Sequence, residues 1–116
     1  MINSTHRFHG HKGLRYVYQN GQTVRGADFA IKFLANPNRQ EYRLAVVVSR
    51  KVEKSAVGRN RLRRRLYEAV RLVQDDISAP YDMVLTVFSK ELSNESAASL
   101  NEQVHKQLRA AKILSK

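Results

Sequence analysis

The chain has 116 residues and a formal net charge of +11, from 21 lysines and arginines against 10 acids. This length predicts one domain with a small core, and the charge predicts a polyanionic partner. The absence of cysteine excludes disulfides and thiolate metal sites, and no stretch approaches the ~20 apolar residues of a membrane span.

The first predicted elements are a polar lead and a short helix. We expect residues 1–9 to be a flexible lead, because they are polar and terminal, and they lack the apolar run of a signal peptide. Residues 11–20 predict a helix, since Leu14, Val17 and Tyr18 recur on one helical face. Gly21 follows as the stop signal.

Three β-strands are predicted next, because apolar and other side chains alternate along each of them. They cover residues 22–25, 28–34 and 42–49. In the third strand, we expect Leu44, Val46 and Val48 to pack under the helix that follows. The intervening residues would form an open face of the sheet.

A long arginine-rich helix is predicted from its N-cap at Ser55 to about Gln74. Its apolar residues recur at steps of three and four: Val57, Leu62, Leu66, Ala69, Val70 and Val73. Five arginines crowd its start and two aspartates follow its end, which is the unfavourable order for a helix dipole. A solvated basic face is the plain alternative, but broken local rules indicate a functional site, and we expect this helix to bind a polyanion.

The last predicted elements are a strand and a helix. Residues 82–88 form a nearly continuous apolar run, which is typical of a central strand covered on both faces. Strand, helix and strand in succession predict a crossover between parallel neighbours. The final helix, capped by Ser93 or Asn94, has acids early and bases late, and we interpret it as structural.

Groups that could perform catalysis are scattered along the chain. Asp75 and Asp76 are the only adjacent acids, and they lie at a helix end where neighbouring side chains diverge. We find no P-loop, serine elbow or metal-ligand pair, so we expect no catalytic residue and no metal ion bound tightly by the polypeptide. A protein-only nuclease would need a carboxylate cluster, whereas composition leaves a ribosomal or general RNA-binding protein open.

The segment AVGRNRLRRRLYEAVR resembles the arginine-asparagine-arginine signature of the bacterial ribonuclease P protein subunit. Arg59, Asn60 and Arg61 stand where that motif stands, and the preceding LAVVVSRKVEKSAV is similar to the family's strand-into-loop pattern. The resemblance covers nearly the whole chain. It implies an α+β two-layer sandwich, order α-β-β-β-α-β-α, in one RNA-binding domain over residues 1–116. It also implies a four-stranded mixed sheet with a left-handed crossover at the arginine-rich helix (ribosomal protein S5 domain 2-like).

The resemblance also implies a function. In that family the RNA subunit is the catalyst, and it removes the 5′ leader of precursor tRNA with Mg²⁺ held through the RNA. The protein subunit of this endonuclease would bind the catalytic RNA and the leader, and it would broaden the range of substrates. We expect a cytoplasmic ribonucleoprotein, without membrane contact, in which a monomeric protein subunit pairs one-to-one with the RNA.

Two binding surfaces are predicted. Arginine forks suit phosphate oxygens, and an asparagine suits a base or ribose edge. The first, RNA-binding surface is Lys51, Lys54, Arg59, Asn60, Arg61, Arg63, Arg64 and Arg65. The second, implied by the resemblance, is a leader-binding cleft between the first helix and the open sheet face: Leu14, Tyr18, Ala30, Lys32, Arg43, Val47 and Tyr67.

The chain departs from the family pattern at three positions of this cleft. Leu14 stands where phenylalanine is frequent, Lys32 where an aromatic residue is common, and Tyr67 where a basic residue is usual. A phosphate contact at Lys32 could therefore replace a stacked base, and Tyr67 could stack on RNA. For Leu14 and Tyr18, ordinary core packing is the alternative.

Overall fold

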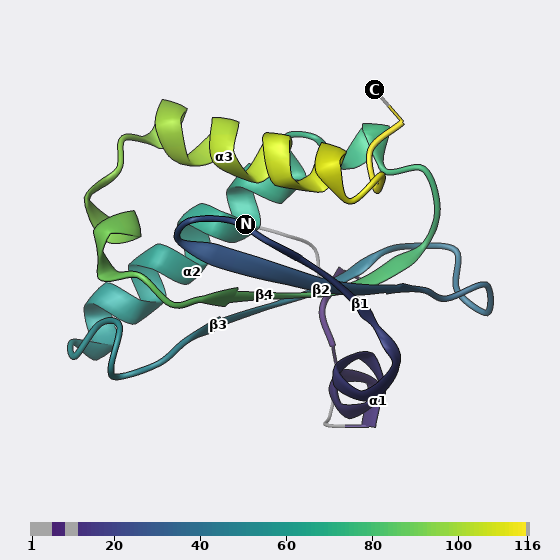
Figure 1. The fold of residues 1–116 in the computed structure, drawn as a ribbon, viewed down its shortest axis with the longest axis horizontal. Helices are drawn as coiled ribbons and strands as arrows, with labels where there is room; N and C mark the ends of the chain where they lie inside the picture. The colour runs from purple at the N-terminus through teal and green to yellow at the C-terminus, as the bar shows by residue number, and fades with distance from the viewer. Residues whose placement is uncertain (1–5, 9–11, 116) are drawn as a thin grey trace.

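The computed structural model describes residues 6–8 and 12–115 as an α+β fold built around one four-stranded sheet (Figure 1). Helices α2 (Ala56–Arg71) and α3 (Ala97–Ala110) lie on one face of the sheet, and α1 (Lys12–Asn20) lies on the other. The helices and strands follow the predicted order α-β-β-β-α-β-α, which confirms the fold class. No helix in this described part of the chain is both long and apolar enough to cross a membrane.

The sheet is mixed and has the strand order β1-β2-β4-β3. Its strands are β1 (Gln22–Arg25), β2 (Phe29–Ala35), β3 (Arg43–Val48) and β4 (Tyr81–Val87). Strand β2 pairs antiparallel with β1 and β4, whereas β3 pairs parallel with β4. Helix α2 therefore connects two parallel neighbours, as predicted, and the carboxyl ends of β3 and β4 lie at the same edge of the sheet.

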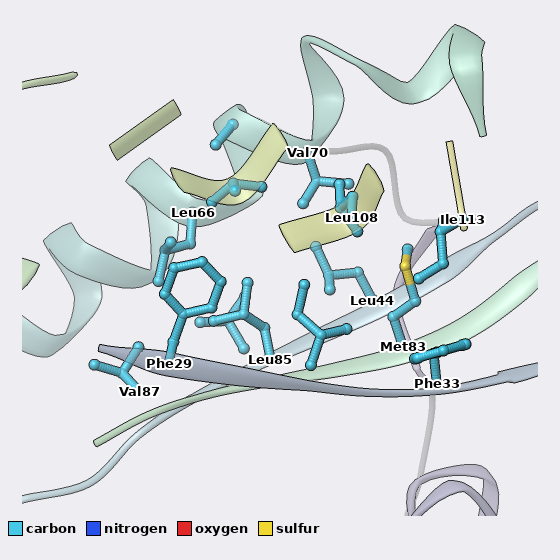
Figure 2. Packing of buried hydrophobic residues seen from close by; sticks show 14 of the residues in the cluster. Phe29, Phe33, Leu44, Leu66, Val70, Met83, Leu85, Val87, Leu108 and Ile113 are labelled. Carbon is cyan, nitrogen blue, oxygen red and sulfur yellow. The ribbon is translucent and has the colours of Figure 1, made fainter. Parts of the chain in front are cut away.

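The hydrophobic core lies between the sheet and the helices α2 and α3 (Figure 2). Leu44, Val46 and Val48 of β3 are buried beneath α2 as predicted, and each large apolar side chain contributes about 1.5–3 kcal/mol. Strand β4 is covered on both faces, because α1 contacts it from the side opposite the core. Val84 on that side is fully buried, which confirms the prediction of a central strand.

Helix α1 ends where the sequence predicts, because the glycine after it is closely packed. The Gly21 N–H donates to the Val17 carbonyl at 2.7 Å. A Cβ at position 21 would lie 2.6 Å from that oxygen and 2.9 Å from the Phe33 carbonyl oxygen. Any larger residue would therefore have to move backbone. The predicted first residue of the helix, His11, lies outside the described residues.

Helix α2 begins as predicted, but it ends earlier and its first turn is less buried than expected. Ser55 is its N-cap as predicted, but the helix ends at Arg71 and not near Gln74. Hydrogen bonds of the i to i+3 kind then tighten the chain into the 3-10 helix η2 (Gln74–Asp76). Val57, which the sequence placed on the apolar stripe, is 76% exposed. The core contacts of α2 begin only with Leu62, so the first turn extends beyond the packed region.

Helix α3 begins later than predicted. Its N-cap is Ser96, and the proposed caps Ser93 and Asn94 instead belong to the separate 3-10 helix η3 (Lys90–Asn94). Leu92 in η3 is completely buried. Burial of Leu92 anchors η3 against the core. The chain then continues through Glu95 to the N-cap Ser96, where α3 starts.

Residues 6–8 pack along the free edge of β3. Arg7 pairs with Leu44 in an isolated parallel bridge. The ring of His6 stacks on Tyr42 with 4.0 Å between centroids, and His6 Nδ1 lies 3.0 Å from the Tyr42 carbonyl oxygen. An uncovered edge strand invites pairing with another chain, and these contacts protect it. Residues 6–8 of the predicted lead therefore make specific contacts with the edge of the sheet, and the rest of the lead lies outside the described residues.

Candidate RNA-binding surfaces

The start of α2 is held by contacts with the loop before it. Ser55 Oγ accepts from the Gly58 N–H at 3.1 Å, and Glu53 Oε1 accepts from the Ser55 N–H at 3.1 Å. Arg59 turns back toward the loop, where its Nη1 donates to the carbonyls of Glu53 at 3.1 Å and Lys54 at 3.0 Å. The half-buried Arg59 therefore fixes the shape of the basic loop as well as adding charge to it.

Arg61 and Arg64 are exposed on α2, and no described residue accepts a hydrogen bond from either. Within the described residues, ion pairs join His6 to Glu41, Arg43 to Asp82 and Arg71 to Glu68. None of the arginines in residues 59–65 takes part in them, and the first turn of α2 contains no acid. The positive charges of Arg61 and Arg64 therefore face solvent without a carboxylate partner among the described residues.

Two other arginines of the predicted surface also bind the protein itself. Arg65 Nη1 donates to the Ser93 carbonyl at 3.2 Å, and its Nη2 donates to the Glu95 carbonyl. These bonds tie α2 to the segment that leads into α3. Arg63 donates to Asn60 Oδ1 and so orients that amide. The predicted residues therefore differ in role, because some of them position the surface that the others present.

Near the C-terminal end of α2, the last arginine of the helix, Arg71, forms an ion pair with Glu68. Arg71 donates through Nε to both carboxylate oxygens of Glu68 at 3.0 Å. These hydrogen bonds hold the pKa of Glu68 below its usual value. Because both side chains are about 40% exposed, solvent screens this pair. The arginines of α2 that have no carboxylate partner among the described residues therefore end at Arg65, well before the helix does.

Lys51 and Lys54 are exposed in the loop between β3 and α2. They line a hollow against η3, to which Lys90 adds a third ammonium group. Glu53 and Glu91 also line this hollow, so three positive charges face two negative ones. The loop is therefore a weaker anion site than the arginine helix beside it.

A second hollow brings the N-terminal segment together with α2. It is lined by Arg7, Asn60, Arg63, Arg64 and Tyr67, without an acid. The guanidinium of Arg7 lies over the Tyr67 ring, 5.2 Å from its centroid, and Arg7 Nε is buried without a hydrogen-bond partner. An unsatisfied buried donor costs about 1–3 kcal/mol. Three guanidinium groups, one of which has an unpaired Nε–H, match a phosphate group.

Sequence reasoning missed Arg7. No apolar period marks residues 1–9, so nothing in the local sequence relates Arg7 to a helix more than fifty residues later. Its position follows from the bridge to Leu44 at the edge of β3. The one available signal was an arginine beside an apolar residue, Phe8, in an otherwise polar segment.

The residues predicted for the leader cleft are divided between the two sheet faces. Tyr67 lies on α2 in the hollow just described, and it belongs with the arginines of that helix. On the opposite side, α1 contacts β2 and β4 and covers part of the open sheet face. That side holds the remaining predicted residues: Leu14, Tyr18, Ala30, Lys32, Arg43 and Val47.

Tyr18 and Lys32 form a pair where α1 meets the sheet. Tyr18 is 43% exposed, and the Lys32 ammonium lies 5.9 Å from the centroid of its ring. Val17 takes the core position of this helix and is fully buried, so core packing does not explain Tyr18. Leu14 is half-buried. An exposed aromatic ring beside an ammonium group suits a nucleotide, which offers a base and a phosphate.

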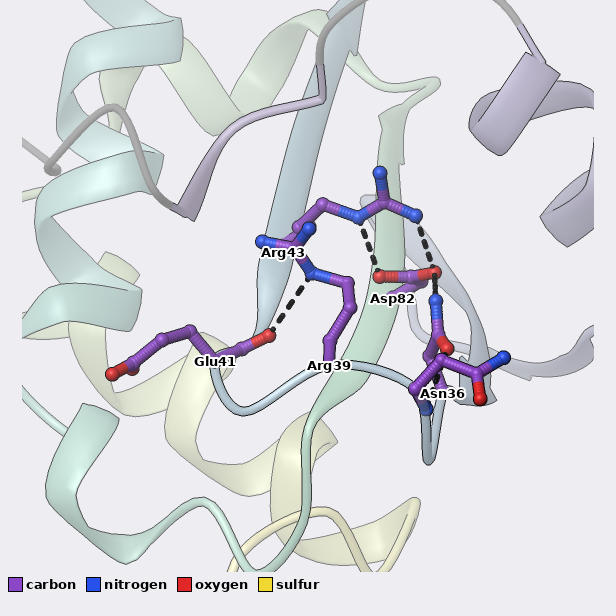
Figure 3. A network of polar contacts seen from close by, with 6 residues as sticks. Asn36, Arg39, Glu41, Arg43 and Asp82 are labelled. Carbon is purple, nitrogen blue, oxygen red and sulfur yellow. Dashed lines mark hydrogen bonds and ion pairs between the residues drawn. The ribbon is translucent and has the colours of Figure 1, made fainter.

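Arg43 is largely committed to the protein (Figure 3). Its Nε and Nη2 donate to the two oxygens of Asp82 at 2.8 and 2.7 Å. Asn36 Nδ2 donates to the same carboxylate at 2.9 Å. The Asp82 side chain is only 5% exposed, and its hydrogen bonds raise the pKa of Arg43. Arg43 also lies over the Phe8 ring at 4.5 Å, so it fixes the N-terminal segment more than it offers a free charge.

The described residues hold no group of three or more His, Cys, Asp or Glu side chains that could bind a metal ion. A further hollow lies between the turn after β1 and helix α3, where Arg25, Lys106 and Gln107 are among its lining residues. None of the residues predicted to bind RNA lines it. The residues predicted to bind RNA therefore lie on α2, on the loop before it, on α1 and on the open sheet face.

An α+β fold with an uncompensated arginine helix on one side and exposed aromatic and cationic side chains on the other defines a small RNA-binding protein of the kind found in ribonucleoproteins. The family model described as Ribonuclease P matches residues 2–112. A ribonuclease P protein component of Chloroflexus aurantiacus is 39% identical over 100 residues, which cover 86% of this chain and 73% of that protein. A ribonuclease P protein component from a Synechococcus strain is 32% identical over 117 residues, which cover 98% of this chain and 87% of that protein.

Solved structures agree at the level of the fold. The RNase P protein of Staphylococcus aureus has a TM-score of 0.84 at 20% identity, over 95% of this chain and 98% of that one. The RNase P protein of Thermotoga maritima has a TM-score of 0.80 at 23% identity, over 90% of this chain and 96% of that one. The chain belongs to the ribonuclease P family, as a protein subunit of that endoribonuclease.

Proposed function

We propose that this subunit binds RNA on two separate surfaces and leaves the bond cleavage to the catalytic RNA. The arginine helix, with Arg7 and the basic loop, grips phosphates of the catalytic RNA. Helix α1 and the open sheet face bind the unpaired 5′ leader of precursor tRNA. The single observation that carries this proposal is the uncompensated charge of α2, where Arg61 and Arg64 meet no carboxylate of the described residues.

The physical role of the protein is electrostatic. Leader, tRNA body and catalytic RNA are all polyanions, and bringing them together costs free energy that bound cations reduce. Neutralising about six phosphates gives a slope of roughly −4 to −5 for the logarithm of the binding constant against the logarithm of salt concentration. Such contacts tolerate any sequence, which a subunit that broadens substrate range requires.

Three further properties belong to this proposal. The Mg²⁺ ions of the reaction are held through the RNA, whose phosphates supply the oxygen ligands that this cation prefers. One monomeric protein subunit joins one RNA in the cytoplasm. A ribosomal or general RNA-binding role, which composition had left open, is not favoured by the family match.

Reconstitution tests the proposed function. The pure protein, a bacterial ribonuclease P RNA and a precursor tRNA are combined at low Mg²⁺, and release of the 5′ leader is followed on a gel. We expect cleavage when RNA and protein are both present and little cleavage by the RNA alone, because protein cations replace part of the Mg²⁺ screening. Cleavage by the protein without RNA, or no effect of the protein, would contradict the proposal.

Tyr18→Ala tests the leader surface separately. Loss of a stacked base costs ~1–3 kcal/mol, so we expect KM for a long-leader precursor to rise about tenfold, while affinity for the catalytic RNA stays unchanged. The matched control is Tyr16→Ala, because Tyr16 is also on α1 and is 59% exposed. It lies two residues away and has no cation partner among the described residues. Equal effects of the two variants would mean that α1 binds RNA without a specific stacking position.

A further inference from the structure

The hollow between the turn after β1 and helix α3 has a volume of about 420 Å³, which is within the range of small-molecule sites. Residues 24–28 form one wall, and the other wall is formed by residues of α3: Gln103, Lys106, Gln107 and Ala110. The turn is fixed in place. The Gly26 N–H donates to the Phe29 carbonyl at 2.9 Å, and the Asp28 carbonyl accepts from the Phe88 N–H at 3.0 Å. The hollow is therefore preformed.

Gln107 places a hydrogen-bond acceptor in this hollow. The residue is only 8% exposed, and its Nε2 donates to the carbonyls of Val24 at 3.1 Å and Phe29 at 2.9 Å. Because both partners are acceptors, the amide nitrogen must face them and Oε1 must point away. That oxygen lies against Gly26, where a Cβ would clash with it, and no described residue donates to it. The glycine therefore leaves room for a buried amide oxygen that lacks a donor.

Asp28 adds a carboxylate to the same hollow. The residue is half-buried, and it takes part in none of the ion pairs among the described residues. A partly desolvated carboxylate is stabilised by N–H donors. Val24, Ala27 and Ala110 supply apolar surface on which a flat ring can lie. Two acceptors beside apolar surface suit a planar ligand that carries more than one N–H donor.

Two cations also line the hollow. Lys106 and Arg25 are exposed, and neither forms an ion pair with an acid of the described residues. The guanidinium carbon of Arg25 lies 4.1 Å from the centroid of the Phe88 ring, and this cation–π contact holds the side chain in place. Ammonium and guanidinium groups bind phosphate oxygens. The ligand that satisfies the whole hollow is therefore a planar donor group attached to phosphate, which is a nucleotide.

The acceptors select the base. Guanine presents two neighbouring donors, N1–H and the N2 amino group, which together match one carboxylate. Adenine and cytosine have an accepting ring nitrogen beside their amino group, and uracil has one N–H between two carbonyls. Each of these three bases would set an acceptor against the Asp28 carboxylate, which costs free energy.

We propose that this hollow binds a free guanine nucleotide, with the base on Asp28 and Gln107 and the phosphates on Lys106 and Arg25. The volume suits a single nucleotide, and no residue of either proposed RNA surface lines the hollow. The occupant is therefore a free nucleotide and not an RNA strand. This site goes beyond the proposed function, because both RNA surfaces can be occupied while the hollow binds its own ligand.

Displacement of a fluorescent guanosine diphosphate (GDP) tests the site. The full-length protein is mixed with GDP that carries an N-methylanthraniloyl group on its ribose, and anisotropy follows binding. We expect unlabelled GDP to displace this probe and adenosine diphosphate to need a concentration about tenfold higher, because loss of a bidentate base contact has about that effect. Equal displacement by both nucleotides and by inorganic pyrophosphate would overturn the proposal, since it would show phosphate contacts alone.

Asp28→Asn provides an exchange of specificity. The asparagine offers one donor and one acceptor in place of two acceptors. Xanthine presents N1–H beside a carbonyl, so this variant should prefer xanthosine diphosphate to GDP, the reverse of the original protein. A loss of stability alone cannot exchange the preference. Asp75→Asn removes the same charge from an exposed acid in η2 and should leave GDP preferred. If Asp28→Asn weakened both nucleotides alike, Asp28 would not read the base and the proposal would fail.

A charge variant tests the phosphate contacts. Lys106→Gln should weaken GDP binding several-fold, because one of the two cations that line the hollow is lost. Lys112→Gln is the matched control, since Lys112 is an exposed lysine just after α3 that does not line the hollow. Equal losses in the two variants would mean that net charge and not this hollow attracts the nucleotide.

Catalytic RNA separates the hollow from the RNA surfaces. We expect the labelled GDP to stay bound when catalytic RNA saturates the protein, because the hollow shares no residue with α2. Displacement of the probe by catalytic RNA or by precursor tRNA would overturn the proposal, because the hollow would then belong to an RNA interface. The reconstituted cleavage reaction needs no GDP, so its failure would count against the proposed function and not against this site.

Discussion

Replacing Arg61 and Arg64 together by alanine is expected to weaken binding of the protein to the catalytic RNA by about 100-fold. Each side chain is exposed and meets no carboxylate of the described residues, so each is free to bind a phosphate. A hydrogen bond to a charged group contributes ~1.5–3 kcal/mol, and 1.4 kcal/mol is a factor of ten. Binding isotherms at several salt concentrations measure the loss, and the log–log salt slope should become shallower by about 1.5–2.

The melting temperature of this double variant should stay nearly unchanged, because neither arginine binds the protein itself. Arg65→Ala is the informative contrast. It removes hydrogen bonds to the carbonyls of Ser93 and Glu95, so it should lower stability as well as affinity. Lys106→Ala combined with Arg109→Ala on α3 removes the same charge elsewhere. If this control weakened RNA binding equally, net charge and not the arginine helix would explain the affinity.

Asp82→Ala is expected to lower the free energy of unfolding by about 3 kcal/mol. It leaves the guanidinium of Arg43 without its partner, and breaking a buried ion pair on one side costs roughly 3–5 kcal/mol. The Arg43 side chain is 17% exposed, so water recovers part of that cost. Asn36 loses its acceptor too. Urea unfolding followed by circular dichroism measures the change, and the melting temperature should fall by roughly 10–15 °C.

The matched control is Asp75→Ala, because Asp75 is an exposed acid in η2 and should change stability by less than ~0.5 kcal/mol. Replacing Arg43 and Asp82 together by leucine should restore much of the lost stability, since no unpaired charge remains buried. If Asp82→Ala and Asp75→Ala were equally mild, the network around Asp82 would be a surface contact without a structural role.

Periodicity in the sequence determined the order of helices and strands. The two-residue alternation of β3 correctly predicted that Leu44, Val46 and Val48 face the core. The three- and four-residue steps of α2 predicted Leu62 and Leu66, both buried. Such predictions succeed because the side-chain period is a property of each element alone.

The ends of elements were predicted less well, because contacts elsewhere decide them. Ser55 caps α2 as expected, since its hydroxyl only needs an amide three residues away. The cap of α3 falls at Ser96 because burial of Leu92 first draws the chain into η3. Ser93 and Ser96 are equally suitable caps by sequence. Only packing decides that Ser96, and not Ser93, caps α3.

The charge of the chain and the arginine motif predicted, from sequence alone, a polyanionic partner and the helix that would bind it. The tertiary structure alone decided which cations are available. It placed Arg7 over Tyr67, paired Arg43 with Asp82 and left Phe88 exposed beside Arg25. The physical reason is that local pattern records how a side chain relates to its own helix or strand. Whether a guanidinium is neutralised or a ring is covered depends on residues that only the folded chain brings near.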